Sequence, residues 1–462
     1  MIPLTLEQLA EVVGGRLQDG ADAARVVGDV VIDSRRATAG ALFVALPGEH
    51  ADGHDYVADA VARGAAGYLA DERRAPLPEP GAVLVDDPGD ALLGLGAWVR
   101  DQVDPRVVAV TGSNGKTTTK DLIAAAVGAG LRTVANEGSY NNELGVPLTC
   151  CKLDEDSQVL VTEIGARGIG HIASLTPLVR PDVAVVTTVA GAHLELFKDL
   201  DTVARAKGEL VESLGPDGVA VLNADDARVA AMRDRAMGRV VTYGVSADAD
   251  WRAGDLRADE LARFSFTARG VRVRCPLPGE HNVGNALAAL AVADVLGVAP
   301  ETAAAGIGAA RVSRWRMEVR RTPSGAVILN DAYNANPASM EAALKTLASM
   351  RVAGRRWAVL GRMAELGDGE REAHDRIGRL CIRLGVDGLV VVGAQARAIR
   401  DAADLEGFYG QGDLFLVDAP AEAAELLRDR LAEGDAVLVK ASRSAGLERV
   451  ADLLAPQGED AP

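Results

Sequence analysis

Cysteine and basic charge are scarce in this sequence, and long hydrophobic runs are absent. The four cysteines (Cys150, Cys151, Cys275 and Cys381) lack the spacing of a disulfide framework or a zinc site, which favours a reducing compartment. Lysine and arginine number 49 against 66 acidic residues, and this net charge of −17 argues against a protein that binds nucleic acid over its surface. No apolar run approaches the roughly 18 residues that cross a bilayer, and residues 1–7 do not resemble a signal peptide. The sequence therefore predicts a cytoplasmic protein with no membrane insertion and no nucleic-acid partner.

Short apolar runs alternate with longer amphipathic stretches along most of the chain, a pattern typical of βα units around parallel sheets. Strands are expected at residues 107–111, 159–164, 183–189, 219–222, 326–330, 357–360, 389–392 and 436–440. At roughly 150 residues per domain, the length favours three domains. An early strand–helix pair ends near residues 103–105, and an alanine-rich helical stretch ends near residues 311–314. We therefore predict an α/β protein with domains at residues 1–104, 105–312 and 313–462.

A phosphate loop is the sharpest local signal. It follows a predicted strand, opens a predicted helix and comprises Thr111, Gly112, Ser113, Asn114, Gly115, Lys116, Thr117 and Thr118. Glycines let backbone N–H groups approach phosphates, and the helix N-terminus adds positive potential. Lys116 is placed to reach the β- and γ-phosphates, and Thr117 to bind Mg²⁺. Val110 stands where the longer form of this loop has glycine, so the loop is a shortened variant. A glycine-rich turn with a chance Lys-Thr is the less favoured alternative.

Polar side chains also stand where predicted strands end, namely Thr111, Glu163, Asp331 and Lys440. Ligands gather at the carboxyl ends of strands in open parallel sheets. One such residue is ordinary, but four of them in two domains indicate a cleft that closes on nucleotide and substrate. Asn282 and Asn285 open another predicted helix and suit an adenine edge, although asparagine at a helix start is more often an N-cap.

Taken in this order, the motifs resemble the Mur ligase family, the ATP-dependent amide-forming enzymes of peptidoglycan precursor synthesis. The shortened loop T-G-S-N-G-K-T-T is the form found in that family, and residues 182–210 resemble its region of metal and carbamylated lysine. Residues 279–289 resemble its adenine-side helix, and residues 313–319 the entry to its third domain. The resemblance implies an N-terminal uridine-nucleotide-binding domain, a central P-loop ATPase-type parallel-sheet domain and a C-terminal Rossmann-like domain.

The resemblance also implies roles for single residues. The expected catalytic group comprises Lys116, Glu163, His193 and Lys207. One Mg²⁺ is assigned to Thr117 and Glu163, and a second to His193 and Lys207, whose ammonium must first become a carbamate because it has no free lone pair. Arg316 and Asp331 are expected to meet ATP after a large domain rotation. The uridine nucleotide is assigned to Ser34, Arg35, Gly53, His54, Asn141 and Asn142, and the acceptor region to Asn334, Asn336 and Lys440.

Three segments narrow the expected substrates. Residues 33–54 resemble the uridine-nucleotide domain shared by the last two ligases of the pathway. Residues 136–147 and 331–337 resemble those family members that join D-Ala-D-Ala to a UDP-N-acetylmuramoyl-tripeptide; in the second of these segments, asparagine stands where neighbouring ligases carry histidine. ATP, Mg²⁺ and a carbamate on Lys207 are the expected cofactors, and the protein is expected to be a monomer. Whether the third residue of the tripeptide is diaminopimelate or lysine stays open.

Three positions depart from the family pattern. Arg362 stands where an acidic residue is usual, Thr188 where asparagine is common, and Ala441 where glycine is common. The charge reversal at Arg362 leaves two alternatives open: a nucleotide-binding regulator or scaffold that has lost ligation, and a ligase of the same family with another acceptor.

Overall fold

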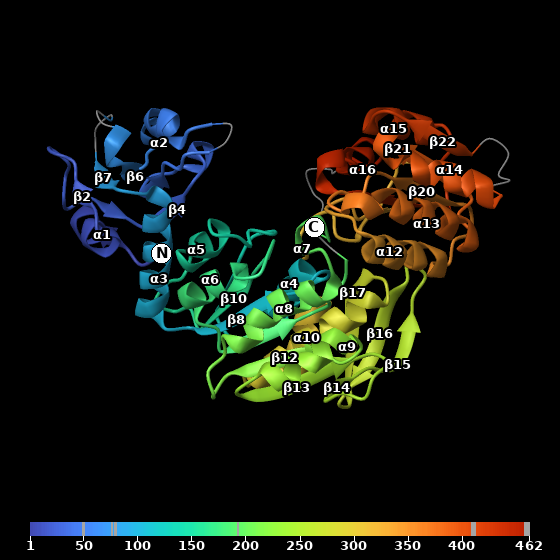
Figure 1. The fold of residues 1–462 in the computed structure, drawn as a ribbon, viewed down its shortest axis with the longest axis horizontal. Helices are drawn as coiled ribbons and strands as arrows, with labels where there is room; N and C mark the ends of the chain where they lie inside the picture. Colours follow the sequence, from blue (N-terminus) through green and yellow to red (C-terminus); the bar gives the residue numbers. More distant parts are fainter. Residues whose placement is uncertain (49–50, 75–76, 78–80, 192–193, 408–412, 457–462) are drawn as a thin grey trace.

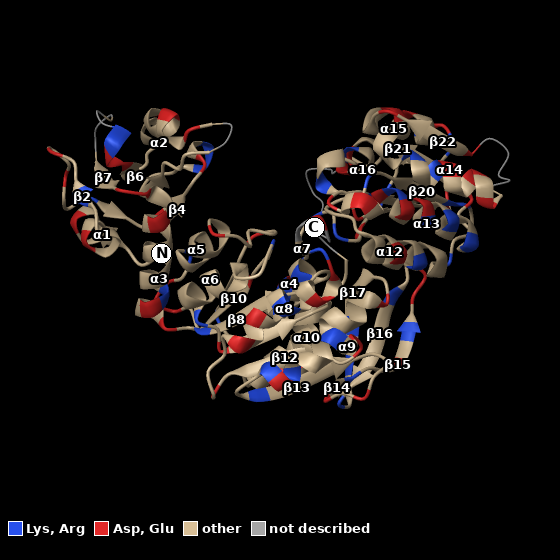
Figure 2. Ribbon diagram, viewed as in Figure 1, with Lys and Arg blue, Asp and Glu red and all other residues tan. Residues whose placement is uncertain are grey.

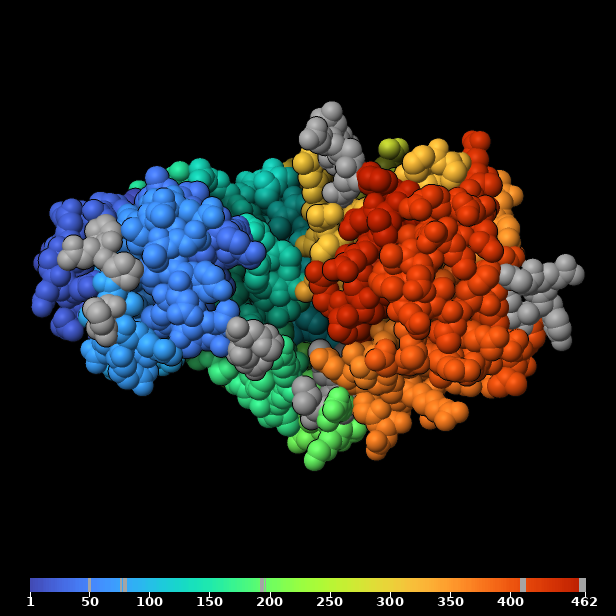
Figure 3. All heavy atoms as spheres, turned by 90° about the horizontal axis from the view of Figure 1, so that it is seen from above, coloured from blue at the N-terminus to red at the C-terminus, as the bar shows by residue number. Residues whose placement is uncertain are grey.

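The computed structural model describes residues 1–48, 51–74, 77, 81–191, 194–407 and 413–456. They form three α/β domains, with the first and third domains rising on either side of the central one (Figure 1). Seen from above, these two outer domains stand apart with the central domain between them (Figure 3). Acidic and basic residues are interspersed over all three domains (Figure 2). None of the helices in the described residues is long and apolar enough to cross a membrane.

The N-terminal domain is built on a five-stranded sheet in the order β2-β7-β6-β5-β4, in which β2 is antiparallel to its neighbour. Its elements are β1 (Leu4–Thr5), α1 (Leu6–Val13), β2 (Arg16–Leu17), β3 (Val26–Val27), β4 (Asp29–Val31), β5 (Ala41–Val44), α2 (Val57–Ala62), β6 (Gly67–Asp71), β7 (Ala82–Val85) and α3 (Pro88–Val103).

The central domain carries a seven-stranded, wholly parallel sheet in the order β14-β13-β12-β11-β8-β10-β9, and an antiparallel sheet β15-β16-β17. Its elements are β8 (Arg106–Thr111), α4 (Lys116–Gly128), β9 (Thr133–Ala135), α5 (Gly145–Cys150), β10 (Val159–Glu163), α6 (His171–Val179), β11 (Val183–Val186), α7 (Leu194–Phe197), α8 (Leu200–Glu212), β12 (Val219–Asn223), α9 (Ala227–Ala230), β13 (Arg239–Gly244), β14 (Trp251–Arg252), β15 (Gly254–Ala258), β16 (Arg263–Ala268), β17 (Val271–Pro278), α10 (His281–Val295) and α11 (Pro300–Gly308).

The C-terminal domain holds a six-stranded sheet in the order β18-β19-β23-β20-β21-β22, parallel except at β18. Its elements are β18 (Glu318–Arg321), β19 (Val327–Asn330), α12 (Pro337–Ser349), β20 (Arg356–Leu360), α13 (Glu370–Arg383), β21 (Gly388–Val392), α14 (Arg397–Glu406), β22 (Leu414–Val417), α15 (Pro420–Arg428), β23 (Ala436–Lys440) and α16 (Glu448–Leu454).

The α/β class predicted from the apolar runs is confirmed, and each of the eight expected strands corresponds to one in the structure. The main difference is β11, which ends at Val186 and not at residue 189. Beyond it, the Thr187 amide still bonds to the Thr111 carbonyl, but the chain then turns across the phosphate loop. The antiparallel sheet β15–β17 was not anticipated, since its strands carry many charged residues on the exposed face.

Helix α3 joins the first two domains into one hydrophobic core. Leu92, Leu95 and Val99 of α3 are buried in the same cluster as Val146 and Cys150 of α5. The C-terminal domain packs most of its apolar residues into clusters of its own. The seam between the first two domains is therefore apolar and continuous.

Gly96 of α3 makes the closest approach at this seam. A Cβ at Gly96 would lie 2.9 Å from the Cα of Pro147, whereas a Cβ at Gly94 on the same helix would meet nothing within 4 Å. Gly96→Ala is expected to cost about 1–3 kcal/mol through overpacking. Gly94→Ala, the matched control, is expected to stabilise by about 0.5–1 kcal/mol because alanine favours a helix. Scanning calorimetry should show the first transition lowered only in Gly96→Ala; equal midpoints for both variants would contradict this account of the seam.

Candidate active site

The phosphate loop lies at the carboxyl edge of the central sheet, between β8 and α4. Two of its glycines are required by the local geometry. Gly112 has φ 146° and Gly115 has φ 80°, both in the region that glycine favours. A Cβ on Gly112 would come within 1.9 Å of the Thr187 hydroxyl, and one on Gly115 within 2.8 Å of Asn285 Oδ1. The loop can therefore pack against β11 and α10 only with glycine at these positions.

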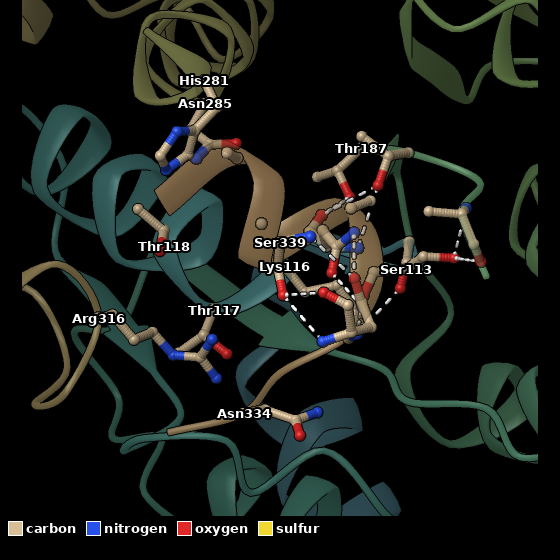
Figure 4. A pocket seen from close by; sticks show the side chains of 18 of the residues that line it. Ser113, Lys116, Thr117, Thr118, Thr187, His281, Asn285, Arg316, Asn334 and Ser339 are labelled. Carbon is tan, nitrogen blue, oxygen red and sulfur yellow. Dashed lines mark hydrogen bonds between the residues drawn. The ribbon is translucent and has the colours of Figure 1, made fainter. Parts of the chain in front are cut away.

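Lys116 points back into its own loop. Its Nζ donates to the carbonyl oxygens of Gly112 at 2.9 Å and Ser113 at 3.4 Å. Burial lowers the pKa of Lys116, and the nearby Arg316 charge lowers it further, while Glu163 opposes both effects. Figure 4 shows Ser113, Lys116, Thr117, Arg316 and Ser339 among the side chains that line the cavity.

A carboxylate and a hydroxyl converge beside the loop. Thr117 Oγ1 donates to Glu163 Oε2 at 2.6 Å, and Asn141 Nδ2 donates to Glu163 Oε1 at 2.6 Å. The Glu163 backbone N–H donates to the side chain of Asn136. Hard oxygen donors of this kind suit Mg²⁺, which commonly takes one or two protein ligands and completes its shell with phosphate and water. Within the described residues, no group of three or more His, Cys, Asp or Glu side chains could hold a metal alone.

Lys207 lies on α8 and is 3% exposed. Burial lowers the pKa of Lys207 to about 7, and the charge of Lys116 acts in the same direction, while Glu163 and Glu209 oppose it. His193, predicted to act with Lys207, lies outside the described residues. Near neutral pH, a substantial fraction of the Lys207 amine is therefore uncharged and nucleophilic.

Residues of the C-terminal domain face the same cavity, whose volume is about 1480 Å³. Lys440 at the end of β23 donates to Asp331 Oδ2 at 2.5 Å and to the Asn334 carbonyl at 2.8 Å. Arg316 stacks on Tyr333, with its guanidinium carbon 4.1 Å from the ring centroid, and donates to Ser139 of the central domain. Arg316 and Asp331, expected to reach ATP after a rotation, already line the cavity of the phosphate loop here.

Several side chains that were predicted to contact ATP form hydrogen bonds with other residues of the protein. Thr111 is fully buried, and its hydroxyl donates to the carbonyl of Ile164. The Asn282 side chain donates to the Pro278 carbonyl, and Asn285 donates to Asn282 while accepting from Thr119. Adenine recognition by these two amides therefore stays a prediction, although both residues line the cavity.

The residues assigned to the uridine nucleotide fall into two groups. Asn141 and Asn142 line the cavity. Ser34, Arg35, Gly53 and His54 lie in the N-terminal domain and do not line it. There, Ser34 donates to Asp59, and Arg35 pairs with Asp33. His54 Nε2 accepts from the Asp71 N–H, so its Nδ1 carries the proton and donates to Asp52. These contacts brace the loops of the first domain.

Sequence reasoning missed three residues that connect the site. Ser139 bonds to both Thr117 and Arg316, joining the hydroxyl at the start of α4 to the start of the third domain. Asn136 holds the backbone of Glu163. The carboxylate of Glu209 accepts from the N–H groups of Gly170 and Ala173, which ties α8 to the start of α6. All three lie in segments that the resemblance singled out, residues 136–147 and 182–210, but it assigned no role to any of them.

Comparison with known proteins agrees with this architecture, and the chain belongs to the Mur ligase family. The Mur ligase middle domain matches residues 110–293, the glutamate ligase domain of Mur ligases matches residues 315–443, and the catalytic domain of the Mur ligase family matches residues 27–85. Within this family, the chain is 42% identical to the UDP-N-acetylmuramoyl-tripeptide--D-alanyl-D-alanine ligase of Mycobacterium tuberculosis strain H37Rv, over 98% of both chains. It is 37% identical to the Escherichia coli K12 enzyme of that name, over 99% of this chain and all of the other.

Solved structures show the same similarity. MurF from Acinetobacter baumannii superposes with a TM-score of 0.84 at 33% identity, covering 98% of this chain and 99% of the other. MurF ligase from Thermotoga maritima in complex with ADP has a TM-score of 0.78 at 28% identity, covering 92% and 96%. The predicted family and three-domain fold are therefore confirmed.

The lowered pKa of Lys207 predicts its reactivity. The neutral amine is the reacting form, so acetylation of Lys207 by acetic anhydride should rise with pH and reach half its maximum near pH 7, at the pKa of about 7. In the guanidinium-unfolded chain, the same lysine should titrate near its ordinary value of 10.5. Mass spectrometry of the Lys207 peptide after timed exposure measures both profiles. A folded-state midpoint near 10 would contradict the effect assigned to burial.

Proposed function

We propose that this protein is an ATP-dependent ligase that adds D-alanyl-D-alanine to UDP-N-acetylmuramoyl-tripeptide. The single observation that carries the proposal is the shared cavity, where Lys116, Glu163 and Lys207 of the central domain face Asp331 and Lys440 of the C-terminal domain. Nucleotide phosphates and an acceptor can be brought together only where two such domains meet. The two bacterial relatives with this activity in their names cover essentially the whole chain.

The reaction requires activation of a poor acyl donor. A carboxylate oxygen of the tripeptide attacks the γ-phosphorus of ATP, ADP leaves, and an acyl phosphate forms. The amine of D-Ala-D-Ala then attacks the acyl carbon, phosphate leaves with the C–O bonding pair, and the amine proton is lost to give the amide. Because two anions must meet in the first step, the positive charge of Lys116 and the loop N–H groups lower the barrier electrostatically.

Thr117 and Glu163 are the residues that would hold Mg²⁺ at the phosphates, since a hydroxyl and a carboxylate already lie 2.6 Å apart there. When bound, Mg²⁺ supplies neutralisation of the phosphate charge. We assign Lys207 as the site of a carbamate, because its buried amine has a pKa of about 7 and can add to CO₂ as the neutral base. The carbamylated lysine, together with His193, is the proposed site of a second Mg²⁺.

Lys440 belongs to the proposed acceptor side and pairs with Asp331, which is assigned to ATP. The Lys440 ammonium is 3% exposed and is held by the Asp331 carboxylate and the Asn334 carbonyl. This arrangement fixes a positive charge at the carboxyl end of β23, where the carboxylate of an incoming dipeptide can be oriented. Asn334 and Asn336, on the loop that leads into α12, complete the proposed acceptor region.

Arg362 was the reason for considering a non-catalytic relative. Its guanidinium donates through Nε and an NH₂ group to both carboxylate oxygens of Glu370, at 2.7 and 2.8 Å, and it does not line the cavity. This pairing lowers the pKa of Glu370 and offsets the reversed charge locally. The unusual arginine at position 362 therefore does not alter the residues that line the cavity of the phosphate loop. This favours an active ligase over a scaffold that has lost ligation.

The domain assignments follow from this function. We propose residues 1–104 for the uridine nucleotide, residues 105–312 for ATP, and residues 313–462 for the acceptor and for closure over ATP. A cytoplasmic location fits an enzyme that consumes ATP and a nucleotide-linked precursor, and we propose a monomer because both sides of the cavity come from one chain.

Phosphate release tests the reaction and its acceptor together. With ATP, Mg²⁺ and UDP-N-acetylmuramoyl-tripeptide, release should depend on added D-Ala-D-Ala and should not be supported by single amino acids. Tripeptides ending in diaminopimelate or in lysine should be assayed in parallel to identify the natural third residue. ATP binding without substrate-dependent release would instead support the scaffold, and release with a different amine would support another acceptor.

Replacement of Lys207 tests the carbamate. Lys207→Ala should lower the rate of phosphate release by about 100-fold or more, because an anionic oxygen donor is lost from the site. Millimolar formate or acetate should restore part of the activity by supplying such a donor. Lys198→Ala, which changes an exposed lysine of the same domain, is the matched control. Full activity of Lys207→Ala without added carboxylic acid would remove the carbamate from the mechanism.

A further inference from the structure

The phosphate loop and the C-terminal domain meet through a direct pair of side-chain amides. Asn336 Nδ2 donates to Asn114 Oδ1 at 2.7 Å, and Asn114 Nδ2 donates to Asn336 Oδ1 at 3.4 Å. The two residues are 222 positions apart in the sequence. Each amide thus acts as both donor and acceptor toward the other. Both hydrogen bonds can form only when the central and C-terminal domains hold one particular relative position.

Asn114 is fixed on its own side by the chain that follows β11. Its backbone N–H donates to the Thr188 hydroxyl at 3.0 Å, and its carbonyl accepts from the Thr187 hydroxyl at 2.6 Å. Thr188, one of the departures from the family pattern, therefore supports the phosphate loop. With its backbone held on both sides, Asn114 has little freedom other than rotation of its side chain.

Asn336 is fixed on the other side as the N-cap of α12. Its Oδ1 accepts from the Ser339 N–H, and the Ser339 hydroxyl bonds back to the Asn336 N–H, which completes a capping box. Asn336 is buried, and Ser339 of the same helix turn lines the cavity together with Lys116 and Ser113 (Figure 4). The far half of α12 reaches the turn before α10, where a Cβ on Gly279 would come within 2.7 Å of Thr346 Oγ1.

We propose that Asn114 and Asn336 are positioning residues that latch the C-terminal domain onto the phosphate loop, so that the acceptor side is held over the loop in the closed arrangement. The catalytic part of this inference rests on the proposed ligase function, whereas the latch itself concerns domain placement alone. The pair is uncharged, so it adds no carboxylate next to a loop that must accept phosphate. Each hydrogen bond shifts the balance between closed and open arrangements by about 2- to 10-fold.

Small-angle scattering of the nucleotide-free protein tests the latch with isosteric variants. In Asn336→Asp and in Asn114→Asp, the new carboxylate can still accept from the remaining amide, and Asp caps α12 as well as Asn does. The double variant places two carboxylates face to face and removes both hydrogen bonds. We expect single variants to scatter like the wild-type protein and the double variant to show a larger radius of gyration. Gln395→Glu, an equivalent change at an exposed position of the C-terminal domain, is the control.

The proposal fails if the double variant scatters like the wild type, if either single variant opens as far as the double, or if the wild-type profile fits only an open arrangement. A double-mutant cycle gives a second test, for which Asn336→Ser keeps a helix cap but is too short for the pair. It should raise KM for D-Ala-D-Ala about 2- to 10-fold, and Asn114→Ala should add nothing to that effect on the acceptor. An additive effect would overturn the coupling. Absence of substrate-dependent phosphate release in the wild type would refute the ligase function and leave the scattering result standing.

Discussion

Three adjacent parallel strands, β10, β8 and β11, end at one edge of the central sheet, and the site depends on that common edge. The phosphate loop leaves β8, Glu163 ends β10, and the threonines that support the loop follow β11. Hydrogen bonds between the strands fix these three groups relative to one another before any ligand is present. Because the strands are parallel, their polar residues meet at one edge and are not divided between the two.

The electrostatics of the cavity follow from this convergence. Lys116, Lys207 and Glu163 line the same cavity, and the charge of Lys116 adds to burial in lowering the pKa of Lys207. Burying positive charge is costly in a folded protein, and a bound anion reduces that cost. The lysines of the cavity, only partly balanced by Glu163, are therefore complementary in charge to a triphosphate.

The sequence predicted the elements that have local signals. The phosphate loop and the eight strands were recognisable because apolar runs, glycines and a Lys-Thr pair lie within a few residues of one another. The partner of Asn114 could not be predicted, since the contact joins residues 222 positions apart and depends on how two domains pack. The same holds for Ser139, whose two partners lie in different domains. Local sequence patterns thus predicted the elements that line the site, whereas the contacts between residues of different domains could be found only in the structure.

The hydrophobic core around α3 joins the first two domains to each other but leaves out the third domain. Apolar side chains of α3 and α5 pack in one cluster, so the first two domains form one cooperative folding unit, whereas the third keeps largely separate cores. Binding energy gained in the first domain therefore also stabilises the sheet that carries the phosphate loop. Under the proposed function, the donor and the nucleotide belong to one body with a shared core, and the acceptor belongs to a second body with cores of its own.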